Sequence, residues 1–263
     1  MKPSLDPILS KNLSDLHMYG IKHSFFTRQC GVFKSFDENL HIENSSSHTP
    51  EEYTAQNRNL IADYFGIGVQ DLITVNQIHS CEVVVAHQAF SNKPPQADAL
   101  VTTEKKLAIG VLTADCGPIL FSDPQAGVIA AAHAGWRGSL NGIVEKTISV
   151  MEEQGAKRQS IIAVLGPCIC SYHYEVTNEF YNKFINIHNK FQIYFLKTDE
   201  NHFNFNLRAF IMDKLKESRV NAYCLKLCTY QDEQRFFSYR RAVHRNKLSY
   251  GRQISAIMLT DKK

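Results

Sequence analysis

Short apolar segments, separated by turn-forming residues, recur along most of the chain and constrain its fold more than any other feature. Segments with the length and residue types of buried strands are 72–75, 82–86, 108–112, 118–122, 127–132, 161–165, 222–227 and 254–259. The turn residues Asp123-Pro124-Gln125-Ala126-Gly127 predict a β-hairpin between two of them. Because strands outnumber helices and some are hairpin-linked, the pattern favours an α+β fold with mixed β-sheets over a doubly wound parallel sheet.

Helix signals occur between these strands. The polar stretch 43–50 predicts a loop, and Thr49-Pro50-Glu51-Glu52 then has the form of a capping box, predicting a helix to about Phe65. Ser139 is expected to cap a helix that runs to about Gln154, with Gly155 at its C-terminal end. Apolar spacing predicts further helices over 175–187 and 207–218.

Composition limits the class of protein. A chain of 263 residues with 44% hydrophobic residues is large enough for one substantial core, or two closely packed ones, and excludes wholesale disorder. No apolar run approaches the ~18 residues that span a bilayer, and the N-terminus lacks the apolar stretch of a signal peptide. We therefore expect no membrane contact, and we interpret the seven cysteines as reduced thiols of a cytoplasmic protein.

Basic charge is concentrated in one segment. Residues 235–252 hold six Arg and Lys and no acidic residue, so the rest of the chain is net acidic although the whole carries +3. One compact basic segment suits a small anionic ligand or a local interaction patch better than nucleic acid. A solvated face paired with acids from elsewhere is the alternative interpretation.

Three residues with metal-binding side chains lie at the ends of predicted strands. His79, Cys116 and His133 are separated by 37 and 17 residues, which is typical of a site assembled from separate strands and unlike the short intervals of a zinc finger. Two imidazoles and a thiolate suit a catalytic zinc with one open position. Cys116 and His133 would serve equally as a nucleophile pair, assisted by Asp115 or Gln77.

Copper is a third possibility, because two His and one Cys also form copper sites. A multicopper cluster needs about ten histidines, commonly in H-x-H pairs. The chain has 11 His but no such pair, which argues against laccase-type chemistry.

Smaller signals surround this set. Arg28, Arg137 and Arg240 are candidate phosphate ligands, and Arg137 precedes a predicted helix where backbone N–H groups would also bind an anion. Cys168 and Cys170 have the spacing of metal ligands, although turn geometry and core packing explain them as well. Aromatic residues interleaved with arginine after Phe236 would stack a purine base, or else form a hydrophobic strand with exposed arginines.

Eight motifs, in order and spacing, resemble those of the YfiH family, the laccase-domain or multicopper polyphenol oxidase-like proteins. They are FFTR (25–28), NQIHS (76–80), ADALVT (97–102), TADCGPILF (113–121), AAHAGWRGSLNGIV (131–144), GPCIC…YEV (166–176), CTY (228–230) and FFSYRR (236–241). The resemblance covers about residues 21–259.

The resemblance implies an α/β sandwich of mixed sheets flanked by helices, with a single catalytic domain over 21–263 and an N-terminal extension over 1–20. It implies a metal site of His79, Cys116 and His133. The implied activities are phosphorolysis of adenosine, inosine and methylthioadenosine, and deamination of adenosine to inosine. Other names in the family imply a copper-dependent polyphenol oxidase, or a Cys–His hydrolase that edits peptidoglycan precursors.

We therefore expect a zinc-dependent enzyme, with copper as the alternative metal, that takes purine nucleosides and phosphate and is a monomer or weak homo-oligomer. For deamination, a zinc-activated water would attack purine C6 while Asp115 moves protons. For phosphorolysis, Arg28, Arg137 and Arg240 would hold phosphate, with Gln77 as a further substrate contact. A partner-binding protein that uses the segment 236–252, with structural zinc, is the non-enzymatic alternative.

Three departures from the family pattern bear on substrate detail. Cys30-Gly31 stands where the family has Gly-Gly, and Asn206 replaces the acid of a D-L-R segment. Ala242 follows FSYRR where an acid is usual. The three expected metal ligands are intact.

Overall fold

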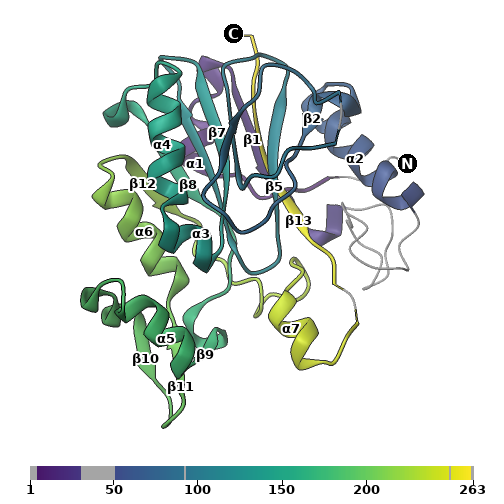
Figure 1. The fold of residues 1–263 in the computed structure, drawn as a ribbon. Coiled ribbons are helices and arrows are strands. Elements are labelled where there is room, and N and C mark those ends of the chain that lie inside the picture. The colour runs from purple at the N-terminus through teal and green to yellow at the C-terminus, as the bar shows by residue number, and fades with distance from the viewer. Residues whose placement is uncertain (1–4, 31–50, 92, 249, 262–263) are drawn as a thin grey trace.

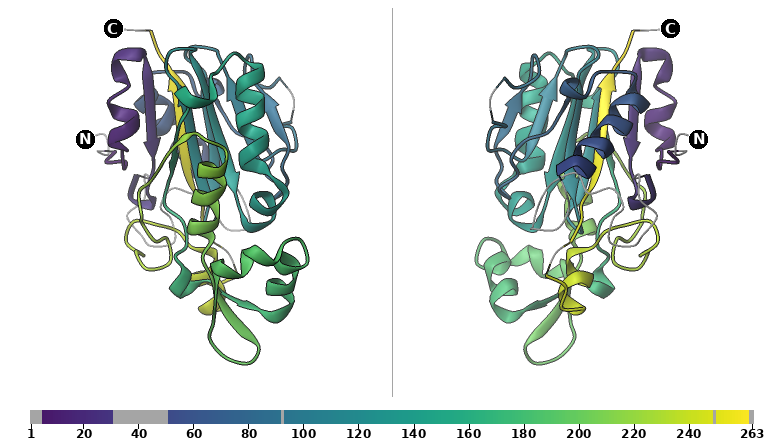
Figure 2. Two further views of the ribbon diagram at one scale, coloured as in Figure 1. Left: turned by 90° about the vertical axis from the view of Figure 1, so that its left-hand side faces the viewer. Right: turned by 90° about the vertical axis from the view of Figure 1, so that its right-hand side faces the viewer.

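The computed structural model describes residues 5–30, 51–91, 93–248 and 250–261, with the side chains of 51–53 excepted (Figure 1). Two β-sheets pack face to face with helices on their outer faces, and a smaller sheet extends from one end of this sandwich (Figure 2). The predicted α+β fold of mixed sheets flanked by helices in one domain is confirmed.

The larger sheet has six strands in the order β12-β8-β6-β7-β4-β3. Its strands are β3 (Val83–Val85), β4 (Ala99–Thr102), β6 (Gly117–Asp123), β7 (Val128–Ala134), β8 (Ile162–Leu165) and β12 (Asn221–Cys224). The predicted hairpin is confirmed as β6 and β7, which pair antiparallel. Asp123 closes its turn by accepting the N–H groups of Gln125 and Ala126 at 3.0 and 3.1 Å, and Gly127 supplies a φ of 68°.

The second sheet has four strands in the order β1-β13-β5-β2. Its strands are β1 (Ile21–Phe25), β2 (Leu72–Ile73), β5 (Ala108–Thr113) and β13 (Gln253–Leu259). Buried apolar side chains such as Ile109 and Ile257 from this sheet meet Leu100 and Ala131 from the larger one. The predicted strands 72–75 and 222–227 are shorter than expected, because only Leu72–Ile73 and Asn221–Cys224 pair as named strands.

Strand alternation in β7 orients the site. Val128, Ala130 and Ala132 belong to the cluster under the helices, whereas Ile129 and Ala131 belong to the cluster between the sheets. Because successive side chains of a strand point to opposite faces, His133 lies on the face of Ile129 and Ala131.

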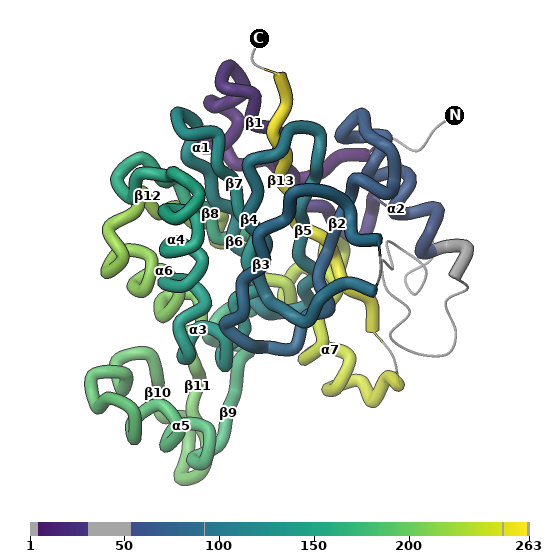
Figure 3. The backbone as a smooth tube through the Cα atoms, turned by 45° about the horizontal axis from the view of Figure 1, so that its top comes forward, coloured from purple at the N-terminus to yellow at the C-terminus, as the bar shows by residue number. Residues whose placement is uncertain are grey.

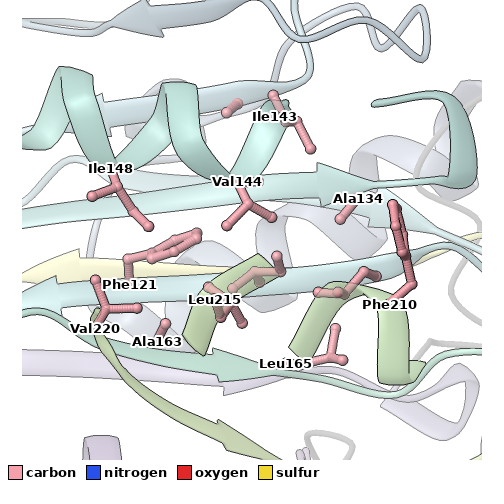
Figure 4. Close-up of a cluster of buried hydrophobic side chains, with 14 of the residues drawn as sticks. Phe121, Ala134, Ile143, Val144, Ile148, Ala163, Leu165, Phe210, Leu215 and Val220 are labelled. Atoms are coloured by element: carbon pink, nitrogen blue, oxygen red, sulfur yellow. The ribbon is translucent and has the colours of Figure 1, made fainter. Parts of the chain in front are cut away.

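Helices α4 (Ile143–Glu153) and α6 (Leu207–Glu217) cover the outer face of the larger sheet, as Figure 3 shows. Figure 4 shows Ile148 of α4 and Leu215 of α6 gathered with Phe121 of β6 in this core. Helix α2 (Glu51–Phe65) packs on the four-stranded sheet through Ile61 and Phe65. Apolar spacing predicted α6, whereas capping residues predicted the helices that contain α2 and α4, and each of the three buries an apolar stripe against a sheet.

The predicted helix from Ser139 to Gln154 is wrong in its start and its continuity. Helix α3 (Trp136–Asn141) begins three residues earlier, and Gly142, with a φ of 98°, separates it from α4. Ser139 lies inside α3 and caps no helix, and its hydroxyl has no hydrogen-bond partner in the described part of the chain. Only a residue without Cβ adopts that φ at little cost, so the break lies at Gly142.

The predicted helix over 175–187 also begins later. Residues Glu175–Thr177 form strand β9, and helix α5 (Asn178–Ile185) begins where the Thr177 hydroxyl accepts the N–H of Phe180. Strands β10 (Phe195–Lys197) and β11 (His202–Phe205) complete a sheet of order β10-β11-β9 that sequence analysis did not predict. Residues 174–206, here called the small lobe, have a core of packed phenylalanines, including Phe184 and Phe205 with ring centroids 4.9 Å apart.

The remaining elements are short helices. Helix α1 (Lys11–Ser14) buries Leu13 against the core between the sheets. Helix α7 (Tyr239–His244) shows that the basic segment opens as a helix, so the alternative of a hydrophobic strand there is wrong. The 3-10 helices are η1 (His17–Tyr19), η2 (Arg28–Cys30), η3 (Val69–Asp71), η4 (Arg158–Ser160), η5 (Ser171–His173) and η6 (Asn189–Tyr194).

Two further predictions concern the segment before helix α2 and membrane-spanning helices. The predicted loop 43–50 and the capping residues Thr49 and Pro50 lie outside the described residues, as do the side chains of the adjoining Glu51 and Glu52. Among the helices in the described ranges, none has the length and apolar character needed to cross a membrane.

Candidate metal and substrate site

Three side chains with metal-binding atoms meet at one end of the sandwich. His79 lies in the loop between β2 and β3, Cys116 directly precedes β6, and His133 is the penultimate residue of β7. One ligand atom of each lies within 4.8 Å of the other two. Cys116 Sγ is 3.9 Å from His79 Nε2, and the two imidazole centroids are 4.7 Å apart. Folding of three separate elements therefore brings together the residues that are far apart in sequence.

Asp98, at the start of β4, organises both histidines, and sequence analysis did not single it out. Its Oδ1 lies 2.7 Å from His133 Nδ1 and accepts the N–H of His79 at 3.0 Å. Its Oδ2 accepts the N–H of Ile78 and both the N–H and hydroxyl of Ser80. Burial raises the pKa of Asp98, but the hydrogen bonds from His133 and Ser80 outweigh burial and lower this pKa to about 2.

The backbone on either side of the site is in unusual conformations. His79 has a φ of 59° and Asp115, the neighbour of Cys116, has a φ of 91°. Residues other than glycine adopt the left-handed region only where their surroundings hold them there, and such residues cluster at functional sites. The Asp98 carboxylate holds the loop of His79 through consecutive N–H groups, which explains how the first of these conformations is maintained.

Cys116 and His133 form an electrostatically coupled pair. Burial raises the pKa of the Cys116 thiol, but the charge and hydrogen bonding of His133, with a smaller contribution from His79, lower it to about 6. Burial lowers the pKa of His133, but the Cys116 thiolate and the Asp98 carboxylate raise it to about 9. The thiolate is therefore the dominant form of Cys116 at neutral pH, as both metal binding and nucleophilic attack require.

Gly135 leaves the space that a bound metal needs. A Cβ at this position would lie 3.0 Å from Cys116 Sγ, 3.1 Å from His79 Cδ2 and 3.7 Å from His133 Nε2. The glycine thus lies against all three ligands, and a side chain at this position would crowd them. Because Asp98 occupies Nδ1 of His133, Nε2 is the atom left for a metal, as in the carboxylate–histidine–metal arrangement of known zinc sites. The residues present therefore fit a metal with two nitrogen ligands and one sulfur ligand.

A cavity of about 410 Å³ opens onto this cluster. His79, Asp115 and Cys116 lie on its wall with residues of helices α3, α6 and α7 and of the small lobe. The lining residues are His79, Ala114, Asp115, Cys116, Trp136, Ile169, Tyr174, Glu175, Val176, Thr177, Phe180, Leu207, Tyr239 and Arg240. The volume falls within the roughly 300–1,000 Å³ of small-molecule sites, and aromatic rings provide much of the apolar wall.

Asp115 is held by three donors. Its Oδ1 accepts the Thr229 hydroxyl at 2.6 Å, and its Oδ2 accepts the Ser238 hydroxyl at 2.9 Å and the N–H of Arg240 at 2.7 Å. Burial raises its pKa despite these hydrogen bonds. Asp115 thus lies in the pocket wall and also ties the turn of Cys116 to the start of helix α7.

Only one of the candidate phosphate-binding arginines lines the pocket. Arg240 does so, with its guanidinium 5.4 Å from the Tyr174 ring centroid and Nη1 donating to the Glu175 carbonyl at 2.7 Å. Arg137 is exposed, with its guanidinium 5.0 Å from the Trp136 ring centroid, and does not line the pocket. Arg28 is buried, and its guanidinium lies 4.6 Å from the Phe237 ring centroid. It is not among the residues that line this pocket.

Gln77 is not among the residues that line the pocket. Its Nε2 donates to the Leu112 carbonyl at 2.8 Å, and its Oε1 accepts the Leu112 N–H at 2.7 Å. Both ends of the amide are thus paired with strand β5. Gln77 therefore braces the loop that carries His79 against strand β5 and does not line the pocket.

Two departures from the family pattern also have structural positions. Asn206 caps helix α6, because its side-chain oxygen accepts the N–H of Ala209 at 3.0 Å. Asn is as good a cap as Asp, so the substitution keeps the helix start. Ala242 is buried inside helix α7.

A family model described as multi-copper polyphenol oxidoreductase laccase matches residues 22–260, and the chain belongs to this family. A solved structure of the Bacillus licheniformis hypothetical protein YfiH is similar over 98% of this chain and 97% of that chain, with 26% identity and a TM-score of 0.82. The resemblance to the YfiH family is confirmed.

Two relatives carry enzyme names. The chain is 35% identical over 238 residues to a purine nucleoside phosphorylase of Rickettsia conorii, covering 86% of this chain and 95% of the relative. It is 39% identical over 136 residues to an adenosine deaminase from an unknown prokaryotic organism, covering 49% of this chain and 52% of the relative.

Proposed function

We propose that this chain is a zinc-dependent enzyme of purine nucleosides. Its reactions are phosphorolysis of adenosine, inosine and methylthioadenosine, and deamination of adenosine to inosine. The names of the two relatives support this substrate class. The seven cysteines are free thiols, which supports the predicted cytoplasmic location.

One observation carries the proposal: the metal-binding cluster opens into a pocket with flat aromatic walls. His79 and Cys116 line the same cavity as Tyr174, Trp136 and Phe180. A purine base presents two apolar faces and a polar edge, so aromatic side chains bind its faces while its reactive edge points to polar groups. This division between apolar walls and a polar end supports a nucleoside more than a fully charged substrate.

His79, Cys116 and His133 would hold the zinc. Zinc with three protein ligands supplies Lewis acidity and activates a nucleophile at neutral pH. The chain's own residues do the rest of the work. Asp98 fixes the His133 ring and keeps Nε2 directed to the cluster, and Tyr174 lies against the face of the pocket where a base would stack.

Asp115 and Arg240 have separate tasks in the proposal. The raised pKa of Asp115 supports a role in holding or moving a proton beside the purine edge. Arg240 is the pocket-lining guanidinium among the candidates, and it would pair with phosphate during phosphorolysis. Arg28 and Arg137 are assigned no phosphate contact, because neither lines the pocket.

A second function is favoured by a specific geometry. Cys116, His133 and Asp98 form a chain of nucleophile, base and orienting acid, which is the arrangement of Cys–His hydrolases. The alternative is therefore a hydrolase that uses Cys116 directly, for example on peptidoglycan precursors. Copper-dependent oxidation of phenols, which the family description suggests, would use the same three ligands.

The test is the turnover of adenosine by zinc-loaded protein with and without phosphate. We expect inosine without phosphate, and adenine with ribose 1-phosphate only when phosphate is present. Cys116→Ser should lose both reactions together with the zinc of this site. Cys81→Ser, which changes a half-buried thiol outside the candidate ligands, should keep them. Failure of zinc-loaded protein to convert any nucleoside would overturn the proposal. Activity of metal-free protein that is abolished by alkylation of Cys116 would establish the hydrolase instead.

A further inference from the structure

A second cluster of soft ligands lies apart from the first. Cys170, His173 and Cys228 each offer one ligand atom within 4.8 Å of the other two. The Cys170 and Cys228 sulfurs are 3.0 Å apart, and the Cys170 N–H points to Cys228 Sγ at 3.3 Å. All three residues are half-buried, so the cluster is shielded but accessible to an ion.

The backbone holds the two cysteine-bearing segments together. Cys168 and Cys228 form an isolated parallel β-bridge. The Cys168 N–H donates to the Leu227 carbonyl at 3.3 Å, and the Thr229 N–H donates to the Cys168 carbonyl at 3.2 Å. The approach of the two sulfurs is therefore set by paired backbone rather than by chance contact of flexible side chains.

The histidine of the cluster is also oriented. The His173 ring stacks on Tyr230, with centroids 4.3 Å apart and planes at 24°. The Tyr230 hydroxyl lies 2.9 Å from His244 Nδ1, which fixes the phenol ring in turn. Second contacts of this kind preorganise metal ligands in known sites.

We propose that Cys170, His173 and Cys228 form a second metal site, for zinc or a similar thiophilic divalent cation. On binding, each thiol loses its proton and forms a sulfur–metal bond, and His173 contributes a nitrogen–metal bond. Two protons are released, no group changes oxidation state, and water takes the fourth position. The donor set matches the tetrahedral preference of zinc for thiolate and imidazole.

The sulfur separation of 3.0 Å lies about midway between that of a metal-bound pair and that of a disulfide, so the third ligand distinguishes the two. Tetrahedral zinc with Zn–S bonds of about 2.3 Å places two sulfurs about 3.8 Å apart, so the pair would open by less than about 1 Å. A disulfide of about 2.0 Å would require contraction by a similar distance and an oxidant, and would leave His173 without a role. A metal would engage all three side chains, whereas a disulfide would engage the two cysteines alone.

One cysteine of the cluster borders a second cavity, and hydrogen bonds connect the cluster to the pocket. A cavity of about 540 Å³ borders Cys228, with Asp232 and Glu233 also on its wall. The Ile169 N–H donates to the Asp115 carbonyl at 2.9 Å, and the Thr229 hydroxyl donates to the Asp115 carboxylate. A metal at this site would clamp the two segments that hold Asp115 in the pocket wall.

The experiment measures metal binding by the full chain, kept in reductant after removal of metal by a chelator. We expect two equivalents of zinc for the unaltered chain and one for Cys170→Ser or Cys228→Ser, with the first site still filled as evidence of folding. Cys81→Ser should bind two. With His79→Ala and Cys116→Ala combined, added cobalt should still give thiolate-to-cobalt charge-transfer absorption, and His173→Ala should weaken this binding about tenfold or more.

The outcomes separate this proposal from the proposed function. One equivalent of zinc in the unaltered chain, unchanged by Cys170→Ser, would overturn the second site whatever the enzyme activity. A Cys170–Cys228 disulfide that persists in reductant and excludes cobalt would overturn it too. Two equivalents of zinc with no turnover of nucleosides would support the second site and contradict the proposed function alone.

Discussion

The Asp98 carboxylate and the His133 imidazole lie 2.7 Å apart, and both side chains are almost completely buried. The same carboxylate accepts consecutive N–H groups of the loop that carries His79. One acidic side chain therefore sets both the ring orientation of one candidate ligand and the backbone conformation of another. The geometry of the cluster depends on a residue that does not itself belong to it.

Replacing Asp98 by Asn should weaken zinc binding about 10–100-fold, because the charge that orients His133 is lost while the size of the side chain is kept. Asp123→Asn is the matched control, since Asp123 is also buried and accepts backbone N–H groups, but in the hairpin turn. The measurement is competition for zinc with a chromophoric chelator. Equal zinc affinity in the two variants would contradict the role given to Asp98.

Gly135→Ala should lose the zinc held by His79, Cys116 and His133, and the activity with it, while the protein stays folded. The added Cβ would come within 3.0 Å of Cys116 Sγ and 3.1 Å of the His79 ring, so the ligands would have to separate. Gly127→Ala is the control, because an added Cβ at this position meets nothing within 4 Å. The φ of 68° at Gly127 is unfavourable for alanine, so this substitution should lower the free energy of unfolding by about 1 kcal/mol. Metal analysis and thermal denaturation of both variants test this, and full zinc occupancy in Gly135→Ala would refute it.

Arg240→Gln should raise the KM for phosphate about 10–100-fold and leave deamination of adenosine nearly unchanged. A hydrogen bond to a charged group contributes about 1.5–3 kcal/mol, which sets this range. Arg137→Gln should change neither, because Arg137 is exposed on Trp136 and outside the pocket. Initial rates at varied phosphate distinguish the two arginines, and a larger effect of Arg137→Gln would show that phosphate binds elsewhere.

The stability of the fold should fall between pH 7 and pH 5 through His23. This residue is buried in β1 and its Nε2 accepts the Ser10 N–H at 2.9 Å, and burial lowers its pKa to about 4. An unfolded histidine has a pKa of about 6.5, so between these values the unfolded chain binds a proton that the folded chain does not. The free energy of unfolding should therefore drop by about 2 kcal/mol from this group by pH 5.

His23→Gln keeps an acceptor for Ser10 and removes the titration. Its unfolding free energy should consequently vary less with pH over the same interval. Urea denaturation at pH 7, 6 and 5 measures both slopes. Identical slopes in the two proteins would show that His23 does not titrate as the buried environment requires.

Sequence patterns predicted the parts of the fold that follow from local chemistry. The hairpin around Asp123 and the helix over 207–218 were predictable because turn residues and apolar spacing act within a few residues. The break at Gly142 and the strands of the small lobe were not, because short strands such as β10 owe their conformation to packing of phenylalanines from distant positions. Tertiary packing overrides local preference in such segments.

Sequence analysis singled out the three side chains of the candidate metal site, but it did not single out Asp98, which holds two of them in place. Residues His79, Cys116 and His133 are conspicuous because each is a polar residue at the end of an apolar strand. Asp98 carried a similar signal, an acid directly before the apolar run 99–102, but nothing in the sequence tells where a carboxylate points. For the same reason Gln77 and Arg137 were indistinguishable from pocket residues until the fold placed their side chains.

The pocket walls come from two parts of the fold, the sandwich and the small lobe. The metal-binding side chains are carried by the sandwich, whereas Tyr174, Thr177 and Phe180 belong to the small lobe that extends from its end (Figure 2). The aromatic core of the lobe continues into the core under helix α6, where Phe184 and Phe210 have ring centroids 5.4 Å apart, whereas the hydrogen bond between Asp98 and His133 is made within the sandwich. The aromatic side chains of the lobe and the three candidate metal ligands thus lie on different stretches of sequence, so substitutions in the lobe would alter the shape of the pocket without replacing a ligand.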